Sequence, residues 1–341
     1  MQVLVTGATG RIGSQVVRDL HSAGHAVRAM AIPNDPGIAR IADLCTDVVE
    51  GKLEDAAAVT EAVAGVDAVC HLGAALTSRL ASDEAFFEVN LRGTFNLLMA
   101  VRDRGAGLHR FIYASSDAVY FVNRTTPPCF LPIDETHPRI PGTIYGATKL
   151  SCEELCLTFR RAYGVPVTMI RFSISHAPAE LIDPASVPGR SLFVSSAIRH
   201  LESLPEYHSL GRRDDGDAAL LTALRAVDDG TNRLFVHADE EGRATIMNTI
   251  DPRDASAGAL ATLERPEAVG QAFNLGPAAP HSELDLCRYI GQRLGLEHAV
   301  VRTPYARRDW YVSSAKARSL LGFEPRYSVF DMVDEAVAAA G

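Results

Sequence analysis

The first half of the chain alternates short runs of apolar and β-branched residues with longer stretches whose apolar residues recur at helical spacing. The short runs predict strands at 2–6, 26–31, 47–50, 68–72, 110–114 and 167–172. The helical spacing predicts helices at 12–23, 56–63, 86–104 and 143–163. Strands and helices that alternate in this way build a parallel sheet with helices on both faces. The pattern therefore predicts an α/β fold with a doubly wound parallel sheet.

The pattern changes after about Ser173, where a proline-rich and then charged stretch at 177–217 replaces the regular alternation. This stretch indicates the start of a smaller and less regular lobe. The segment Asn274-Leu-Gly-Pro is typical of a strand that returns to the main sheet, and helices are expected at 283–294 and 313–321. The sequence shows no internal repeat and no low-complexity linker, so we expect the smaller lobe to be interleaved with the main domain.

Composition and charge exclude several functional classes. The 341 residues carry a net charge of −9 that is spread without a basic block, so binding to nucleic acids is not expected. The N-terminus has no leader-like segment and no apolar run reaches about 18 residues, which predicts a cytoplasmic protein that does not enter a membrane. The six cysteines are expected to be free thiols. Cys152 and Cys156 lie one helical turn apart but lack further ligands at suitable spacing, so no metal site is expected.

A glycine-rich turn lies between the first predicted strand and the first predicted helix. Its glycines are Gly7, Gly10 and Gly13. In this context the first permits a tight turn, the second lets the backbone approach a pyrophosphate, and the third allows the helix to pack closely on the strand. The motif predicts a Rossmann-like, dinucleotide-binding domain over 1–173, with returning segments around 245–276. Residues 174–341 are then expected to form mostly a substrate-binding lobe.

The second predicted strand does not settle which dinucleotide binds. An acid at its end favours NAD, whereas a following base favours NADP. Here the strand ends in Met30-Ala-Ile-Pro, with Asp35 beyond the proline and Arg11 and Arg28 as the nearest bases. We expect NAD as the cofactor, and NADP is not excluded.

Tyr145 and Lys149 have the spacing that puts two side chains on one face of a helix. A lysine cation in this position is expected to lower the pKa of the phenol, so that the tyrosine becomes an acid or base near neutral pH. Ser115 and Ser116 end the preceding predicted strand, where a hydroxyl can hold a substrate oxygen. These residues indicate hydride-transfer chemistry assisted by a tyrosine.

Together these motifs resemble the extended short-chain dehydrogenases/reductases, the NAD-dependent epimerase/dehydratase family, over nearly the whole chain. The resemblance implies that Ser116, Tyr145 and Lys149 are the catalytic residues. It implies a cofactor site formed by Gly7, Gly10, Arg11, Ile12, Gly13, Leu72, Gly73, Ala74, Asn90, Tyr145 and Lys149. It also implies a substrate site that includes Ala75, Ser116, Asp117 and Ser173. A homodimer is implied as well, through the helix of Tyr145 and the helix that follows Asn90.

The chain departs from the family pattern at several positions. Phe121 replaces a usual glycine, Lys52 stands where an acid is frequent, and Ser173-Ile-Ser-His-Ala-Pro replaces the frequent Asn-x-Tyr-Gly-Pro. Leu234-Phe-Val-His lacks the Arg-Asp that precedes this segment in nucleotide-sugar enzymes. The family's dehydratases carry Asp-Glu after the catalytic hydroxyl, to remove a carbon-bound proton and to help hydroxide leave. Asp117-Ala118 lacks the glutamate, so dehydration by that route is disfavoured.

The sequence thus predicts an NAD(P)-dependent oxidoreductase that acts on an alcohol or carbonyl of a sugar, a sugar acid or a similar polyhydroxylated molecule. A nucleotide-sugar epimerase working through a transient keto form is the alternative. A non-catalytic dinucleotide sensor is disfavoured because Ser116, Tyr145 and Lys149 occur together.

Overall fold

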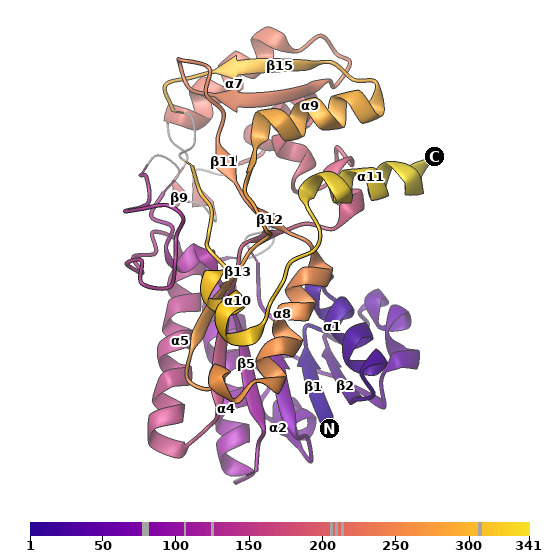
Figure 1. Ribbon diagram of the computed structural model, residues 1–341, viewed down its shortest axis with the longest axis vertical. Coiled ribbons are helices and arrows are strands. Elements are labelled where there is room, and N and C mark those ends of the chain that lie inside the picture. The colour runs from indigo at the N-terminus through magenta and orange to yellow at the C-terminus, as the bar shows by residue number, and fades with distance from the viewer. Residues whose placement is uncertain are drawn as a thin grey trace.

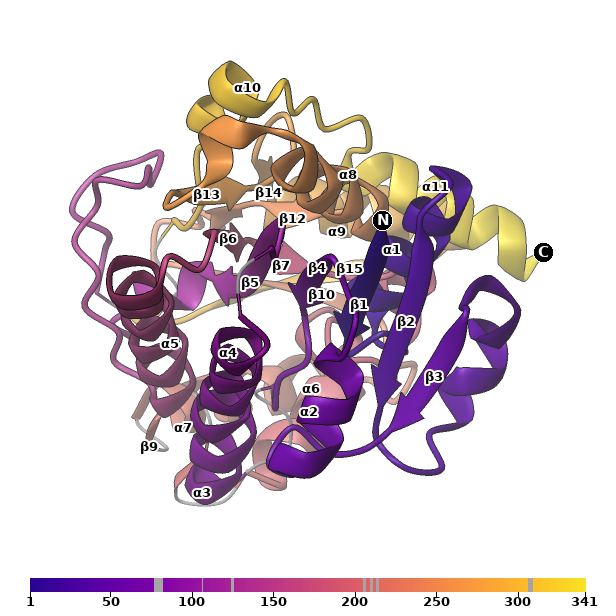
Figure 2. The same cartoon turned by 90° about the horizontal axis from the view of Figure 1, so that it is seen from below.

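The computed structural model describes residues 1–76, 82–105, 107–123, 126–204, 207–208, 211–212, 215–305 and 309–341. Its main element is a seven-stranded parallel sheet in the order β13-β6-β5-β4-β1-β2-β3, seen from one end in Figure 2. The strands are β1 Gln2–Thr6, β2 Ala26–Ala31, β3 Asp47–Glu50, β4 Ala68–His71, β5 Arg110–Ser116, β6 Val167–Phe172 and β13 Ala272–Leu275. This confirms the predicted α/β class and the parallel, Rossmann-like sheet.

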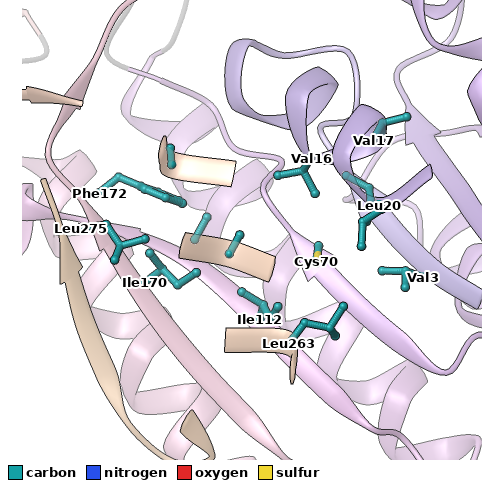
Figure 3. Packing of buried hydrophobic residues seen from close by; sticks show 14 of the residues in the cluster. Val3, Val16, Val17, Leu20, Cys70, Ile112, Ile170, Phe172, Leu263 and Leu275 are labelled. Carbon is teal, nitrogen blue, oxygen red and sulfur yellow. The ribbon is translucent and has the colours of Figure 1, made fainter. Parts of the chain in front are cut away.

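Helices cover both faces of the sheet (Figure 2). One face packs against α2 (Ala56–Val63), α4 (Gly93–Asp103) and α5 (Ile144–Tyr163). The other packs against α1 (Arg11–Ser22), α8 (Pro252–Glu264) and α10 (Ala315–Leu321). Figure 3 shows the second core, in which Val16 and Leu20 of α1 and Leu263 of α8 meet strand residues such as Ile112 and Ile170. Burying aliphatic side chains on both faces is what a parallel sheet requires.

The stretch predicted as one helix at 86–104 is built differently. It consists of α3 (Asp83–Ala85), a π-helical turn (η3, Phe86–Arg92) and α4. A π turn holds one residue more than an α turn and is rare. Here the Asn90 side chain bonds the backbone of Ala75, and the Thr94 hydroxyl donates to the Asn90 carbonyl at 2.6 Å. These bonds outside the helical ladder accompany the wider turn.

The smaller lobe is built around the parallel pair β10 (Leu234–Ala238) and β15 (His298–Arg302). Its helices are α6 Val194–Glu202, α7 Asp215–Val227, α9 Glu283–Leu294 and α11 Val329–Ala340. Short pairs join it to the main sheet, namely β7 (Ile174–Ser175) with β12 (Thr249–Ile250) and β11 (Ile246–Met247) with β14 (His281–Ser282). Figure 1 shows late elements, α8, β13 and α10, lying beside the early strands and helices of the larger lobe.

Three further findings bear on function. The six cysteines are free thiols. In the part of the chain that the structure describes, no helix is long and apolar enough to cross a membrane. Among the same residues, no group of three or more His, Cys, Asp or Glu side chains is placed to hold a metal ion.

Candidate active site

The order of strands in the main sheet reverses between the neighbouring strands β1 and β4, and their carboxyl ends lie side by side. Ligands of doubly wound sheets bind at such switch points. Gly7 follows β1 with a φ of 63°, and Gly73 follows β4. A Cβ on Gly7 would lie 2.7 Å from the Cα and N atoms of Gly73, so the two turns touch and only glycine fits at position 7.

The N-terminus of α1 follows the glycine-rich turn at this edge of the sheet. Gly10 is the N-cap residue, and among the described residues neither a side-chain cap nor an acidic side chain occupies the first turn. A Cβ on Gly13 would lie 2.0 Å from the Gly7 carbonyl oxygen, so α1 approaches β1 as closely as a helix can. The uncapped N–H groups of Arg11, Ile12 and Gly13 form a positive helix end that fits a pyrophosphate.

Side chains of the predicted cofactor residues are used in different ways. The side chains of Ile12 and Leu72 are partly buried and pack against the hydrophobic core. Arg11 forms a two-pronged ion pair with Glu180, with N–O distances of 2.7 and 2.6 Å, and donates to the Ser175 carbonyl at 2.9 Å. Arg11 therefore ties the glycine-rich turn to the other lobe.

Asp35 lies beside the glycine-rich turn, which the sequence did not indicate. The Thr9 hydroxyl donates to Asp35 at 2.6 Å and the Gly37 N–H donates to it at 2.8 Å. These two hydrogen bonds hold the pKa of Asp35 below its ordinary value. The structure thus places a carboxylate where the end of β2 lacks one, because the turn after Pro33 folds back onto Thr9.

A chain of hydrogen bonds connects the turns that follow β1 and β4 with the π turn. The Thr94 hydroxyl donates to the Asn90 carbonyl, so its oxygen accepts from His71 Nε2 at 2.9 Å. His71 Nδ1 then accepts the Thr6 hydroxyl at 2.7 Å, and Thr6 accepts the Gly73 N–H at 3.1 Å. Burial lowers the pKa of His71 to about 3, which keeps this imidazole neutral.

Asn90 fixes the segment that follows β4. Its amide accepts the Ala75 N–H at 2.7 Å and donates to the Ala75 carbonyl at 3.2 Å and to the Thr148 hydroxyl at 3.3 Å. Ala74 and Ala75 are partly buried beside it. Asn90 acts as a brace between this segment and α5.

Ser116, Tyr145 and Lys149 are brought together by β5 and α5. Ser116 is the last residue of β5, and its Oγ accepts the Ala118 N–H at 3.1 Å. Tyr145 lies in the first turn of α5, which begins after the N-cap Thr143. The Ser116 hydroxyl lowers the pKa of the Tyr145 phenol, in opposition to burial. Lys149, one turn further on, lies 5.8 Å from the centre of the Tyr145 ring and donates to the Ala114 carbonyl at 2.7 Å.

The expected lowering of the Tyr145 pKa is wrong for the protein alone. Burial, with a smaller contribution from the charge of Asp117, raises the pKa of Tyr145 to about 12. Burial also lowers the pKa of Lys149 to about 8. Lys149 directs its ammonium at a backbone carbonyl rather than at the phenol oxygen, so removal from water dominates both groups.

Asp117 is a buried carboxylate beside the catalytic hydroxyl. It accepts the Ser116 hydroxyl at 3.2 Å and the indole N–H of Trp310 at 3.0 Å. Its side chain is 7% exposed, and burial raises the pKa of Asp117 to about 6. Sequence reasoning gave no sign of Trp310, which is 193 residues away along the chain.

A buried ion pair joins Glu153 of α5 to Arg171 of β6. Glu153, on α5, accepts both guanidinium ends of Arg171 at 2.8 and 2.7 Å and the Ser115 hydroxyl at 2.6 Å. Arg171 also bonds the Tyr120 hydroxyl at 2.5 Å. Because β5, β6 and α5 meet in this cluster, it fixes the position of Ser116 relative to Tyr145 and Lys149.

These observations match one protein family. A profile of the NAD dependent epimerase/dehydratase family matches residues 3–247. The chain belongs to this family.

Members and relatives of the epimerase/dehydratase family match over most of the chain. A crystal structure of a short-chain dehydrogenase/reductase superfamily protein from Agrobacterium tumefaciens with bound NAD has a TM-score of 0.85 and 34% identity, covering 100% of this chain and 97% of that one. A UDP-glucose 4-epimerase of Lactobacillus helveticus is 26% identical over 100% of this chain and 96% of its own. A dTDP-glucose 4,6-dehydratase of Mycobacterium tuberculosis is 32% identical over 73% of this chain and 76% of its own.

The position of the family's Asn-x-Tyr-Gly-Pro segment carries polar atoms that the protein leaves without partners. The Ser173 and Ser175 hydroxyls and His176 Nδ1 are buried and unbonded among the described residues. Asn248 Oδ1 and His281 Nε2 are also buried and unbonded among the described residues. Asn248 lies between β11 and β12, and His281 begins β14. Buried polar atoms without partners are rare, which points to a polar ligand at this place.

Proposed function

We propose that this family member is an NAD-dependent enzyme that oxidises or reduces a carbon–oxygen centre of a sugar derivative. The observation that carries the proposal is the meeting of Ser116, Tyr145 and Lys149 at the carboxyl end of β5 and the first two turns of α5.

NAD is supported by the fit of the chain and by the NAD bound in the relative from Agrobacterium tumefaciens. The first turn of α1 would hold the pyrophosphate through the N–H groups of Arg11, Ile12 and Gly13. Gly10 leaves the N-terminal end of α1 without a side chain, which suits the close approach of a pyrophosphate. Bound NAD supplies a hydride acceptor or, when reduced, a donor. Asp35 would repel the additional phosphate of NADP, which supports the preference for NAD.

Each catalytic side chain has a separate role in the proposal. In reduction the neutral phenol of Tyr145 gives its proton to the carbonyl oxygen, and in oxidation Tyr145 acts as the phenolate that takes the hydroxyl proton of the substrate. Ser116 holds the same substrate oxygen by a hydrogen bond. Lys149 supplies positive charge near the phenol, which favours the phenolate. The raised pKa of Tyr145 keeps it protonated at neutral pH, ready to act as the acid.

The substrate class is supported by two observations. The unbonded side-chain atoms of Ser173, Ser175 and His176 suit the hydroxyl groups of a polyhydroxylated molecule. The epimerase and the dehydratase among the relatives are named for nucleotide sugars. Ala118 leaves no carboxylate at the position next to Asp117, so we do not favour dehydration.

Epimerisation is the second candidate, because an epimerase matches the whole chain. The two candidates differ in their net redox change. A dehydrogenase forms one NADH for each substrate oxidised, whereas an epimerase interconverts two substrates without net NADH. Following absorbance at the NADH wavelength and the products by NMR, over a panel of sugars, sugar acids and nucleotide sugars, distinguishes them.

A homodimer is proposed through α4 and α5, which lie side by side on one face (Figure 2). This face exposes apolar side chains, including Phe95 at 42% and Tyr163 at 54%. Exposed aromatic groups on adjacent helices are typical of protein contacts.

Replacing Tyr145 by phenylalanine tests the proposal. The ring and its packing against Phe86 remain, and only the acid/base group is lost. We expect turnover to fall by about two to four orders of magnitude while NAD affinity by calorimetry is retained. Ser116→Ala should lower turnover less, and Lys149→Met should lower both turnover and NAD affinity.

A surface variant such as Tyr163→Phe serves as the control, because it makes the same chemical change on α5 away from Ser116. It should keep the activity of the natural enzyme. Near-normal turnover in Tyr145→Phe on a substrate that the natural enzyme converts would overturn the assignment.

A further inference from the structure

The catalytic hydroxyl is connected to the C-terminal part of the chain by two hydrogen bonds. The indole Nε1–H of Trp310 donates to one oxygen of Asp117 at 3.0 Å. The other oxygen accepts the Ser116 hydroxyl at 3.2 Å. Asp117 therefore lies between a residue of the last quarter of the chain and the residue proposed to hold the substrate oxygen. Proteins rarely bury a carboxylate without such donors.

The backbone around Trp310 is held firmly. The Trp310 N–H donates to the Ile246 carbonyl at 2.8 Å, and Asp309 accepts the Ile246 N–H at 2.9 Å. Two residues further on, Val312 forms a bridge with Ile133. The indole ring packs edge-on against Phe121, with the ring centres 5.4 Å apart. The position of the indole is thus set by β11 and by the loop that follows Ser116.

We propose that Trp310 is a positioning residue for the reaction, which acts through Asp117 to keep the Ser116 hydroxyl in place beside Tyr145. The proposal rests on the proposed function, since it assigns Trp310 to the same site. The ionised carboxylate accepts both donors at once. A protonated carboxyl group loses the charge that attracts them, and the Ser116 hydroxyl is then free to turn.

Asp117 titrates in an accessible range, because burial raises its pKa to about 6 while the bonds from Trp310 and Ser116 oppose that rise. On α5, which packs on the short 3-10 helix that begins at Asp117, the ionisable groups of the first two turns are Tyr145 and Lys149, and Asp309 and Tyr311 flank Trp310. Tyr145 and Lys149 change charge at higher pH, near 12 and 8 by their pKa values. An event near pH 6 at this place is therefore assigned to Asp117.

Trp310 is the only tryptophan in the sequence, so its fluorescence reports on this contact directly. We expect the emission of the natural protein, without substrate, to change with a midpoint near pH 6. The change should be absent in Asp117→Asn, which keeps an oxygen acceptor but does not titrate. A transition that persists unchanged in Asp117→Asn would overturn the contact.

Kinetics test the positioning role. Trp310→Phe keeps an aromatic ring and removes only the indole donor. Losing one hydrogen bond to a charged group should raise the acidic midpoint of the turnover profile by about one to two pH units. Turnover measured at pH 6 should then fall by about five- to fifty-fold, and turnover at pH 8 by no more than about two-fold. In the Asp117→Asn background, the same substitution should have no further effect on the profile.

Phe121→Leu is the matched control, because it removes the edge contact with the indole and leaves the donor. Its midpoint should stay within a few tenths of a pH unit of the natural enzyme. An equal shift in Phe121→Leu and Trp310→Phe, or no shift in Trp310→Phe, would show that Trp310 only fills space.

The outcomes separate this inference from the proposed function. If Tyr145→Phe loses turnover and Trp310→Phe leaves the pH profile unshifted, only the role of Trp310 fails. If Tyr145→Phe retains turnover while the fluorescence transition depends on Asp117, the proposed proton transfer fails and the contact stands.

Discussion

Three ionisable side chains at the candidate site are buried, and burial shifts the pKa of each. Lys149 is 4% exposed, and burial lowers its pKa to about 8. Asp117 is buried with its pKa raised to about 6, and Tyr145 is shifted upward to about 12. All three shifts disfavour the charged form. Groups shifted in this way cluster at active sites, where they serve chemistry at the expense of stability.

This reasoning predicts that Lys149→Met stabilises the fold. The folded pKa of Lys149 lies below its unfolded value, so the protonated lysine opposes folding below about pH 8, and the penalty disappears as pH rises toward 10.5. At pH 7 the substitution should raise the free energy of unfolding by on the order of 2 kcal/mol, allowing for the lost bond to Ala114. Urea unfolding at pH 7 and pH 10 measures it. A gain that is equal at both pH values would contradict the explanation.

The sequence revealed those residues whose partners are near in the chain. Tyr145 and Lys149 are one helical turn apart, and Ser116 ends a strand with a clear apolar pattern. Asp35 and Trp310 were missed because turns far from their partners place them, and no local pattern encodes such a meeting. The direction of the Tyr145 shift was also missed, because spacing does not reveal burial.

At the level of elements, the regular alternation in the first half of the chain could be predicted, whereas long elements of the second half such as α7, α8 and α11 were missed. The strands of the main sheet and helices α1, α2 and α5 were located within one or two residues, since each has several turns or alternations. The two-residue strands β7, β11, β12 and β14 carry no periodicity. The π turn at Phe86–Arg92 was read as part of a regular helix, because one inserted residue barely alters an apolar pattern. The division of the chain near residue 173 stays a prediction.

The glycines of α1 are expected to have separable effects. Gly10 has a φ of −71°, which any residue adopts, and a Cβ there meets only the Gly7 carbonyl oxygen at 3.2 Å. Gly10→Ala should therefore fold normally and bind NAD at least ten-fold more weakly. Gly13→Ala places a Cβ 2.0 Å from the same oxygen and should lower stability by about 1–3 kcal/mol. Thermal unfolding and calorimetry of both variants measure the two effects, and equal melting temperatures would refute the distinction.

At the scale of the whole molecule, contacts between the lobes are as specific as those inside them. Arg11 reaches from the glycine-rich turn to Glu180 and Ser175, and Trp310 reaches from the C-terminal segment to Asp117. Both lobes therefore contribute to one site, and neither would retain it alone.

The proposed dimer predicts that a charged substitution on α4 lowers the mass of the protein in solution. Phe95 is exposed on α4 and its ring meets Phe159 of α5 edge-on, with centres 6.1 Å apart. Phe95→Lys would place a charge in the proposed contact, and we expect sedimentation analysis to find a monomer where the natural protein is a dimer. Phe130→Lys, at an equally exposed aromatic residue outside α4 and α5, should leave the mass unchanged. A monomeric natural protein would refute the proposal.

The edge strand β13 can join the main sheet only late in the synthesis of the chain. It pairs with β6, yet it is translated roughly a hundred residues later. Ribosomes add about 5–20 residues per second, so β6 spends on the order of 5–20 s without its partner strand on one edge. That edge belongs to Val167–Phe172, a β-prone and mostly apolar run that could pair with a neighbouring nascent chain. During this interval the growing protein depends on chaperones, or on the speed of its own synthesis, to reach the closed sheet.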